Sequence, residues 1–139
     1  MIYVDTSALL KLVRTEAESE ALEAFVADRP DEPLVSSVLV AIETRRAMLR
    51  QTTAMLPRAD LLLTRVGQVG LSHAIVESAG RLPHPALRSL DAIHLATALV
   101  LGNEVSVLVT YDKRLATAAR EHRLQVAAPG GDTNGTVRR

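Results

Sequence analysis

The amino-acid sequence predicts an α/β fold in which helices cover both faces of a central, mainly parallel sheet. Predicted strands alternate with predicted helices, and the clearest strands, Ile2–Val4 and Val105–Val109, are continuous apolar runs. Such runs are typical of parallel strands that are buried on both faces. The 139 residues are enough for one domain with a substantial core. We expect this domain over residues 1–128 and a glycine-rich, flexible tail over 129–139.

The first predicted strand leads directly into a helix. The apolar run Ile2–Val4 stops at Asp5, and Thr6 and Ser7 are residue types that cap helices, so a helix is expected over Ala8–Val13. The next helix is amphipathic, with its glutamates and its apolar residues on different faces. The elements expected after the first helix are the helix Glu16–Ala27, the strand Leu34–Ser37, the helix Val38–Arg50 and, opened by Pro57, the helix Arg58–Val66.

The C-terminal half holds the most apolar helix of the chain. Ser89 precedes the helix Leu90–Leu101, which is apolar nearly all round and should be buried, and Gly102 and Asn103 end it. The segment Gly70–Ser72 fits a strand or a turn equally well. The other elements expected here are the helix Ala74–Leu82, the strand Val105–Val109, the helix Leu115–Arg120 and the strand Gln125–Ala127.

The composition excludes several classes of function. The chain has no cysteine, so a bound metal would need oxygen or imidazole ligands. Aromatic residues make up 2% of the chain, which argues against proteins that stack bases on aromatic side chains. The formal net charge is zero, so any nucleic-acid binding must be local. We expect a cytoplasmic protein without a membrane span, because apolar runs fall short of about 18 residues and the N-terminus lacks a basic region.

Four acidic residues stand where the predicted fold would bring their side chains toward one edge of the sheet. Asp5 ends the first strand, and Asp112 follows the strand Val105–Val109. Asp91 lies in the first turn of the buried helix, and Glu43 interrupts an apolar stretch. Ligands bind at the carboxyl ends of parallel strands, and clustered carboxylates repel one another unless a cation lies among them. The pattern therefore suits a hard divalent cation such as Mg²⁺ or Mn²⁺.

Each acid also has a purely structural interpretation. Asp5 and Asp112 could cap helices, and Asp91 would be favoured by the dipole of its helix. Glu43 could form an ion pair with Arg46 one turn later. The joint occurrence of all four residues, rather than any one of them, favours the metal site.

Four segments in the same order resemble the successive motifs of a known family. They are Val4–Leu9, the position of Glu43, Leu90–Ala98 and Leu108–Leu115. These segments resemble the motifs of PIN domains, and most closely those of VapC toxins from bacterial VapBC toxin–antitoxin modules. The D-A-x-H-x-A-x-A and T-x-D patterns are specific when they occur together, and the resemblance extends over residues 1–128. It implies a three-layer α/β/α PIN-like fold.

The resemblance implies a metal-dependent endoribonuclease, the toxic component of a type II toxin–antitoxin system. The residues that match the family's metal-binding acids are Asp5, Glu43, Asp91 and Asp112, and those that match its supporting hydroxyl groups are Ser7 and Thr110. One or two Mg²⁺ or Mn²⁺ ions would activate water for in-line attack on phosphorus, which leaves a 5′-phosphate and a 3′-hydroxyl. The alternative is an inactive PIN-like module that binds RNA or a protein; the presence of all four acids favours activity.

The resemblance also implies partners, namely an RNA substrate, a VapB-like antitoxin and a second copy of the chain. We expect the antitoxin to occupy a groove between two helices, and the dimer interface to form on two others. The groove would lie between Glu16–Ala27 and Val38–Arg50, with Leu22, Phe25 and Leu39 among its apolar residues, and the interface would involve Pro57–Val66 and Ala74–Leu82.

Other polar residues have two open interpretations. His94 could be a catalytic base, but a hydrogen-bonded packing histidine is favoured, because metal-activated water needs no imidazole base. Three arginines of one predicted helix could line a groove for RNA phosphates or form a solvated face: Arg45, Arg46 and Arg50.

Overall fold

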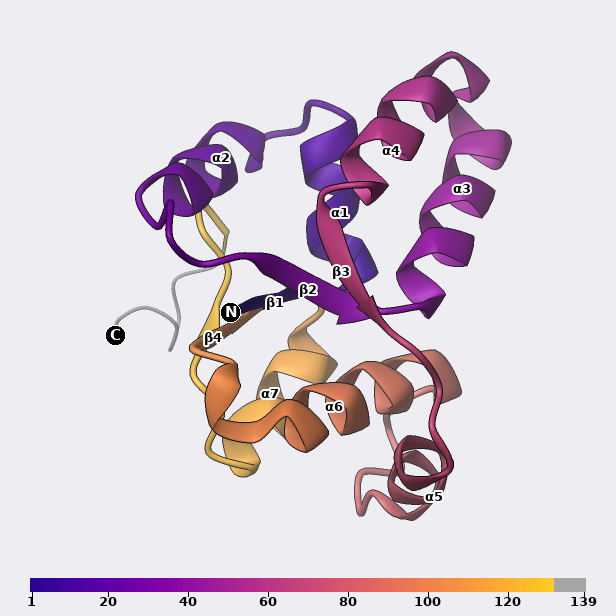
Figure 1. The fold of residues 1–139 in the computed structure, drawn as a ribbon, viewed down its shortest axis with the longest axis vertical. Coiled ribbons are helices and arrows are strands. Elements are labelled where there is room, and N and C mark those ends of the chain that lie inside the picture. Colours follow the sequence, from indigo (N-terminus) through magenta and orange to yellow (C-terminus); the bar gives the residue numbers. More distant parts are fainter. Residues whose placement is uncertain (132–139) are drawn as a thin grey trace.

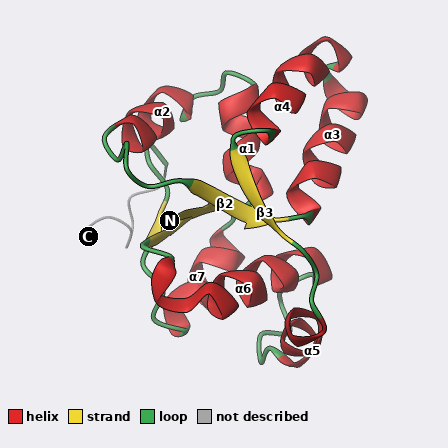
Figure 2. Ribbon diagram, viewed as in Figure 1, coloured by secondary structure: helices red, strands yellow, loops and turns green. Residues whose placement is uncertain are grey.

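A five-stranded sheet separates two layers of helices in the computed structural model, which describes residues 1–131 (Figure 1). The strands are all parallel in the order β3-β2-β1-β4-β5, and Figure 2 shows the sheet enclosed between the helices. The strands are β1 (Ile2–Val4), β2 (Leu34–Ser37), β3 (Val66–Val69), β4 (Val107–Val109) and β5 (Val126–Ala127). The predicted three-layer α/β/α fold is confirmed.

The helices divide between the two faces of the sheet (Figure 1). One face is covered by α1 (Thr6–Val13), α2 (Ser19–Ala27), α3 (Leu39–Gln51) and α4 (Leu56–Leu63). The other is covered by α5 (His73–Arg81), α6 (Ser89–Leu101) and α7 (Lys113–Glu121). Two short 3₁₀ turns, η1 (Thr53–Met55) and η2 (Gly102–Glu104), follow α3 and α6.

The central strand β1 contributes to both layers of the core. Its side chains alternate between the faces, so that Ile2 and Val4 pack with Leu9 of α1, whereas Tyr3 packs with Leu95 of α6. All five side chains are completely buried. This double burial explains why the strand is a continuous apolar run.

Helix α6 is buried through its middle, as its composition predicts. Ala92, Leu95 and Ala98 are buried, while Val100 near its end is 54% exposed. The helix ends at Gly102, whose φ of +61° and ψ of −128° suit a residue without a side chain.

The prediction that one helix extends to Val66 is wrong. Helix α4 ends at Leu63, and Val66 begins β3, where it pairs with Leu34 of β2. Val66 is buried, and a buried valine fits the apolar face of a helix as well as a strand, so the pattern alone did not separate them. The segment Gly70–Ser72 is no strand, and the Ser72 side chain caps α5.

The predicted tail begins within the described residues. The Tyr111 hydroxyl donates a hydrogen bond of 2.7 Å to the carbonyl oxygen of Pro129. Residues 132–139 lie outside the described part of the chain, so the tail and the domain boundary at residue 128 stay predictions. Within residues 1–131, no helix is long and apolar enough to cross a membrane.

Leu108→Ala is expected to lower the free energy of unfolding by about 2–5 kcal/mol, because Leu108 of β4 is completely buried between the sheet and the second helix layer. Chemical denaturation measures the change. Leu49→Ala is the matched control, since Leu49 is 46% exposed and its truncation should cost less than about 1 kcal/mol. Equal costs for the two variants would contradict the core assignment.

Candidate active site

The sheet register places Asp5 beside Thr110. Val4 of β1 pairs with Val109 of β4, so the residues that follow them meet at the carboxyl edge of the sheet. The Thr110 hydroxyl donates a 2.6 Å hydrogen bond to Asp5 Oδ2, and Asp5 is only 3% exposed.

The carboxylate of Asp5 is held by neutral donors. Ser7 Oγ and the backbone amide of Ala8 donate to Asp5 Oδ1 over 2.7 and 3.0 Å. Asp5 is therefore the N-cap of α1, and Thr6 and Ser7, the residues predicted to cap, form its first turn. The extended backbone of Asp5 at the strand end suits a cap. Burial raises the pKa of Asp5, and the His94 imidazole and these hydrogen bonds offset only part of that effect.

Ser7 and Thr110 connect the ends of β1 and β4, as their predicted supporting role requires. Ser7 Oγ accepts a 2.9 Å hydrogen bond from the amide of Tyr111 and lies 3.4 Å from Thr110 Oγ1. Thr110 Oγ1 in turn accepts a 3.0 Å hydrogen bond from the amide of Asp112. The two hydroxyl groups thus orient Asp5 and the loop that carries Asp112.

Glu43 of α3 points toward α1 and α6. Its Oε1 accepts a hydrogen bond of 2.5 Å from the Thr6 hydroxyl and one of 3.0 Å from His94 Nε2, and Arg46 does not pair with it. Burial by itself would raise the pKa of Glu43, but the hydrogen bonds from His94 and Thr6 outweigh it and lower the pKa.

His94 is the packing histidine that the sequence favours. It is 1% exposed, and its ring lies edge-on to that of Tyr3. The carboxylate of Glu43 can only accept, so His94 Nε2 carries a proton, and in the neutral ring Nδ1 accepts from the Tyr3 hydroxyl 2.8 Å away. His94 therefore holds Glu43 in place from the core.

Asp91 and Asp112 stand at the N-terminal ends of α6 and α7. Asp112 caps α7, its Oδ1 accepting from the amides of Arg114 and Leu115 over 2.9 and 3.1 Å. Burial is the main cause that raises the pKa of Asp91, and the negative charges of Asp112 and Asp5 add to it. Glu43 raises the pKa of Asp91 as well, so all four predicted acids share one electrostatic neighbourhood.

The donor set fits a divalent cation by its chemistry, although its side chains are not gathered around one point. Within residues 1–131, no three Asp, Glu or His side chains form a group arranged as metal ligands. Asp5, Glu43 and Asp112 are each oriented by local donors. Burial raises the pKa of both Asp5 and Asp91, and neighbouring carboxylates add to the effect on Asp91, so a hard cation would relieve the cost of ionising these groups.

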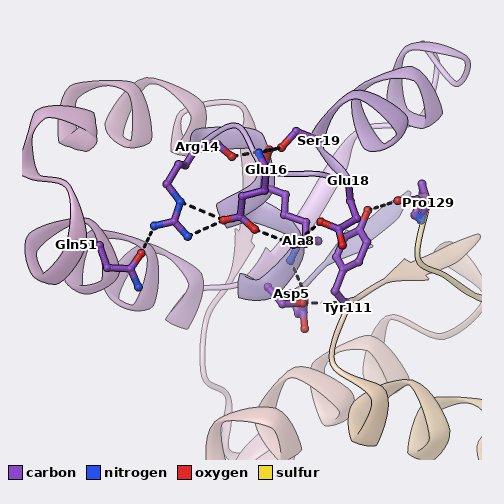
Figure 3. A network of polar contacts seen from close by, with 11 residues as sticks. Asp5, Ala8, Arg14, Glu16, Glu18, Ser19, Gln51, Tyr111 and Pro129 are labelled. Carbon is purple, nitrogen blue, oxygen red and sulfur yellow. Dashed lines mark hydrogen bonds and ion pairs between the residues drawn. The ribbon is translucent and has the colours of Figure 1, made fainter. Parts of the chain in front are cut away.

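Basic residues at the C-terminal end of α1 are engaged elsewhere (Figure 3). Lys11 Nζ donates to Glu16 over 2.8 Å and to Glu18 over 2.9 Å, and Arg14 bonds to Glu16 and Gln51. These pairings neutralise charge within the first helix layer and leave the Asp5 carboxylate to its neutral donors.

The groove expected between the second and third helices stays a prediction, but Leu22 is not exposed to line it. Helix α1 lies between α2 and α3 and contacts both, and Leu22 is completely buried in the core (Figure 1). Phe25 also packs against this core, and its ring stacks under the Arg29 guanidinium at 3.6 Å. The amphipathic pattern identified an apolar face without revealing that the protein's own helices cover it.

The three arginines singled out from the sequence lie away from the site acids in the cavity, and whether they contact RNA stays a prediction. Arg45, Arg46 and Arg50 form an exposed face of α3, where Arg45 pairs with Asp60 over 2.8 Å. Three other basic residues line a cavity of about 320 Å³ together with the acids Asp91 and Asp112: they are Arg88, Lys113 and Arg114. Their closeness in sequence to the two acids was the signal that could have identified them.

Comparisons with known proteins agree with this fold. A family model described as "PIN domain" matches residues 2–121. Ribonuclease VapC35 of Mycobacterium tuberculosis is 44% identical over 132 residues, which cover 94% of this chain and 98% of that protein.

Solved structures show the same fold at lower identity. The crystal structure of Mycobacterium tuberculosis VapC20, a "Sarcin-Ricin loop cleaving toxin", matches with a TM-score of 0.71 and 20% identity over 85% of this chain and 95% of that one. A "toxin-antitoxin complex" from Klebsiella pneumoniae matches with a TM-score of 0.62 and 22% identity over 81% and 88%.

Asp91→Asn is expected to raise the free energy of unfolding at neutral pH in metal-free buffer. A carboxyl whose pKa is raised by folding destabilises the folded state when it is ionised, and this penalty disappears as the pH falls below the unfolded pKa. The gain should therefore vanish toward about pH 3. Denaturation with chelator across this range measures it, with exposed Asp31→Asn as the control. A loss of stability at neutral pH would contradict the prediction.

Glu43→Gln is expected to lower the free energy of unfolding at neutral pH, which is the opposite of the effect expected for Asp91→Asn. Because folding lowers the pKa of Glu43, its charge stabilises the folded protein above the unfolded pKa, and this stability is lost as the pH falls through the folded pKa. The variant should unfold more easily than the parent at neutral pH and approach it in acid. Exposed Glu23→Gln serves as the control in the same titration. If the variant is less stable than the parent by the same amount at all pH values, the charge of Glu43 is not the cause of the lost stability.

Proposed function

This chain belongs to the PIN domain family and, within it, to the VapC ribonucleases, and from this we propose that it is a metal-dependent endoribonuclease, the toxic component of a type II toxin–antitoxin system. The family model spans most of the chain, and the chain covers nearly the full length of its ribonuclease relative. Since its substrate is cellular RNA, we expect it to act in the cytoplasm.

The single observation that carries this function is the buried Asp5 carboxylate at the carboxyl edge of the sheet. Three neutral donors fix its orientation, while burial raises its pKa. Perturbed carboxylates concentrate at functional sites, and the three other acids lie in the same electrostatic neighbourhood. We assign the metal-binding role to Asp5, Glu43, Asp91 and Asp112.

Asp5, Asp91 and Glu43 have distinct parts in this assignment. A bound Mg²⁺ or Mn²⁺ would supply the positive charge that activates water and offsets charge on the phosphate. Asp5 provides a rigid carboxylate, because its cap and the Thr110 hydroxyl fix both oxygens. Asp91 lines the adjacent cavity, where a ligand could reach it. His94 and Thr6 donate the hydrogen bonds that orient Glu43 and act as positioning residues.

An inactive module that binds RNA or a protein is the second candidate. It would need none of the hydroxyl groups that orient Asp5, and its acids would be free to pair with arginines. The Ser7 and Thr110 hydroxyls instead hold Asp5 as a carboxylate without an ion-pair partner, which favours catalysis.

We also propose two protein partners, a small VapB-like antitoxin and a second copy of this chain. The antitoxin is supported by the toxin–antitoxin complex with the same fold. Exposed apolar side chains occur on both helices expected at the dimer interface, since Leu61 of α4 is 61% and Val76 of α5 is 50% exposed. These helices lie on opposite faces of the sheet, so the interface would use one of them or the edge between them (Figure 1).

Asp5→Asn and Asp91→Asn should each reduce RNA cleavage by more than about a hundredfold, because both remove the charge that holds a divalent ion. Asparagine keeps an acceptor oxygen, so the cap of α1 should survive. Cleavage of defined RNAs with Mg²⁺, Mn²⁺ or chelator measures the effect. Mn²⁺ should raise the melting temperature of the parent and that of the variants much less.

Asp31→Asn is the matched control and should cleave RNA like the parent. Metal-independent cleavage, or full activity in both site variants, would refute the assignment of these acids. RNA binding without cleavage under any metal condition would support the inactive module instead.

Expression of the protein is expected to arrest growth, and co-expression of the small protein encoded beside it should relieve the arrest. The reason is that a toxin of this family is neutralised by direct binding. The two proteins should co-purify, and light scattering should give the mass of a dimer of the toxin at micromolar concentration. Arrest that persists without co-purification would contradict the antitoxin proposal, and a monomer mass would contradict the dimer.

A further inference from the structure

A cavity with a basic rim opens directly beside two of the site acids. It measures about 320 Å³, and its lining consists of Arg88, Asp91, Asp112, Lys113 and Arg114. The basic and the acidic side chains come from the same two short segments, at the starts of α6 and α7. A ligand in this cavity would therefore contact cationic groups and site acids together.

The arginines of this rim are not paired with acids. Arg88 and Arg114 are exposed and form no ion pair with the described residues, although two carboxylates line the same cavity. By contrast, Arg14, Arg45 and Arg81 each pair with a carboxylate. The guanidinium groups of Arg88 and Arg114 remain available for an anion from outside the chain.

The start of α6 adds a second feature that suits an anion. Its N-cap position is held by Arg88, whose side chain makes no capping hydrogen bond to the helix. The first amides of α6 therefore lack the side-chain acceptor that Asp5 gives α1 and Asp112 gives α7. A phosphate oxygen at this position would act as the missing cap.

We propose that Arg88 and Arg114 bind a backbone phosphate of the RNA substrate and hold it against Asp91 and Asp112. This rests on the proposed ribonuclease function and names the groups that receive its substrate. A guanidinium can donate two parallel hydrogen bonds to phosphate oxygens, and such contacts set the register of the nucleic acid without reading its sequence. A chain without net charge thereby gains a local cationic site where the RNA must be cut.

Binding of a short single-stranded RNA, measured by fluorescence anisotropy with chelator, tests the proposal without cleavage. In Arg88→Ala/Arg114→Ala, the dissociation constant should rise at least about tenfold, by a similar factor for unrelated sequences. The magnitude of the slope of log affinity against log salt should fall by about 0.7, the value for one phosphate contact on a single strand. Arg65→Ala is the matched control, since exposed Arg65 precedes β3 at the opposite edge of the sheet, and it should bind like the parent.

A second variant, Arg88→Lys/Arg114→Lys, keeps the positive charges but loses the paired guanidinium donors, and it should recover part of the affinity. Circular dichroism and the Mn²⁺-induced rise in melting temperature should match the parent in both double variants, which separates lost RNA contacts from misfolding or lost metal binding.

Affinity in the alanine variant equal to that of Arg65→Ala would overturn the proposal, as would a parent that binds no RNA. Unchanged RNA binding with lost antitoxin binding would also overturn it and assign the cavity to the protein partner. If the parent binds RNA through these arginines but does not cut it with any metal, the proposed function fails and this inference stands.

Discussion

The parallel pairing of Val4 with Val109 is the contact on which the site depends. It brings Asp5 against Thr110 at the carboxyl edge, and from there the loop to Asp112 and α7 follows. A shift by one residue would turn every side chain of β1 to the opposite face, and Tyr3 would leave its place beside α6. One register therefore fixes both the packing of the core and the position of the acids.

The same edge carries an electrostatic cost that the rest of the fold must offset. Burial raises the pKa of Asp5 and Asp91, and the other acids raise that of Asp91 further, so ionisation of these groups opposes folding at neutral pH. The aliphatic core on both faces of the sheet supplies the stability that tolerates this cost. Within the described residues, Lys11 and Arg14 of the first helix layer pair with Glu16, so their charges do not neutralise the site acids.

The sequence was sufficient where one local pattern determines one structure. Short, largely apolar runs located four of the strands, and strand ends, a helix start and an interrupted apolar stretch located the acids. It was insufficient where two patterns coincide, as at Val66, or where the outcome depends on which helix covers a face, as at Leu22. The basic cavity was missed because Arg88 and Arg114 meet only when α6 and α7 pack side by side.

The chain of hydrogen bonds from Tyr3 through His94 to Glu43 connects the two helix layers across the edge of the sheet. Burial raises the pKa of Tyr3, so its hydroxyl stays protonated and can donate a hydrogen bond to His94. His94 and Asp91 lie three residues apart on α6, and so on neighbouring positions of one helix face. A movement of α6 would therefore displace Asp91 and the support of Glu43 together. Because α6 is buried, Asp91 keeps its position relative to Glu43, whose carboxylate His94 holds from the core.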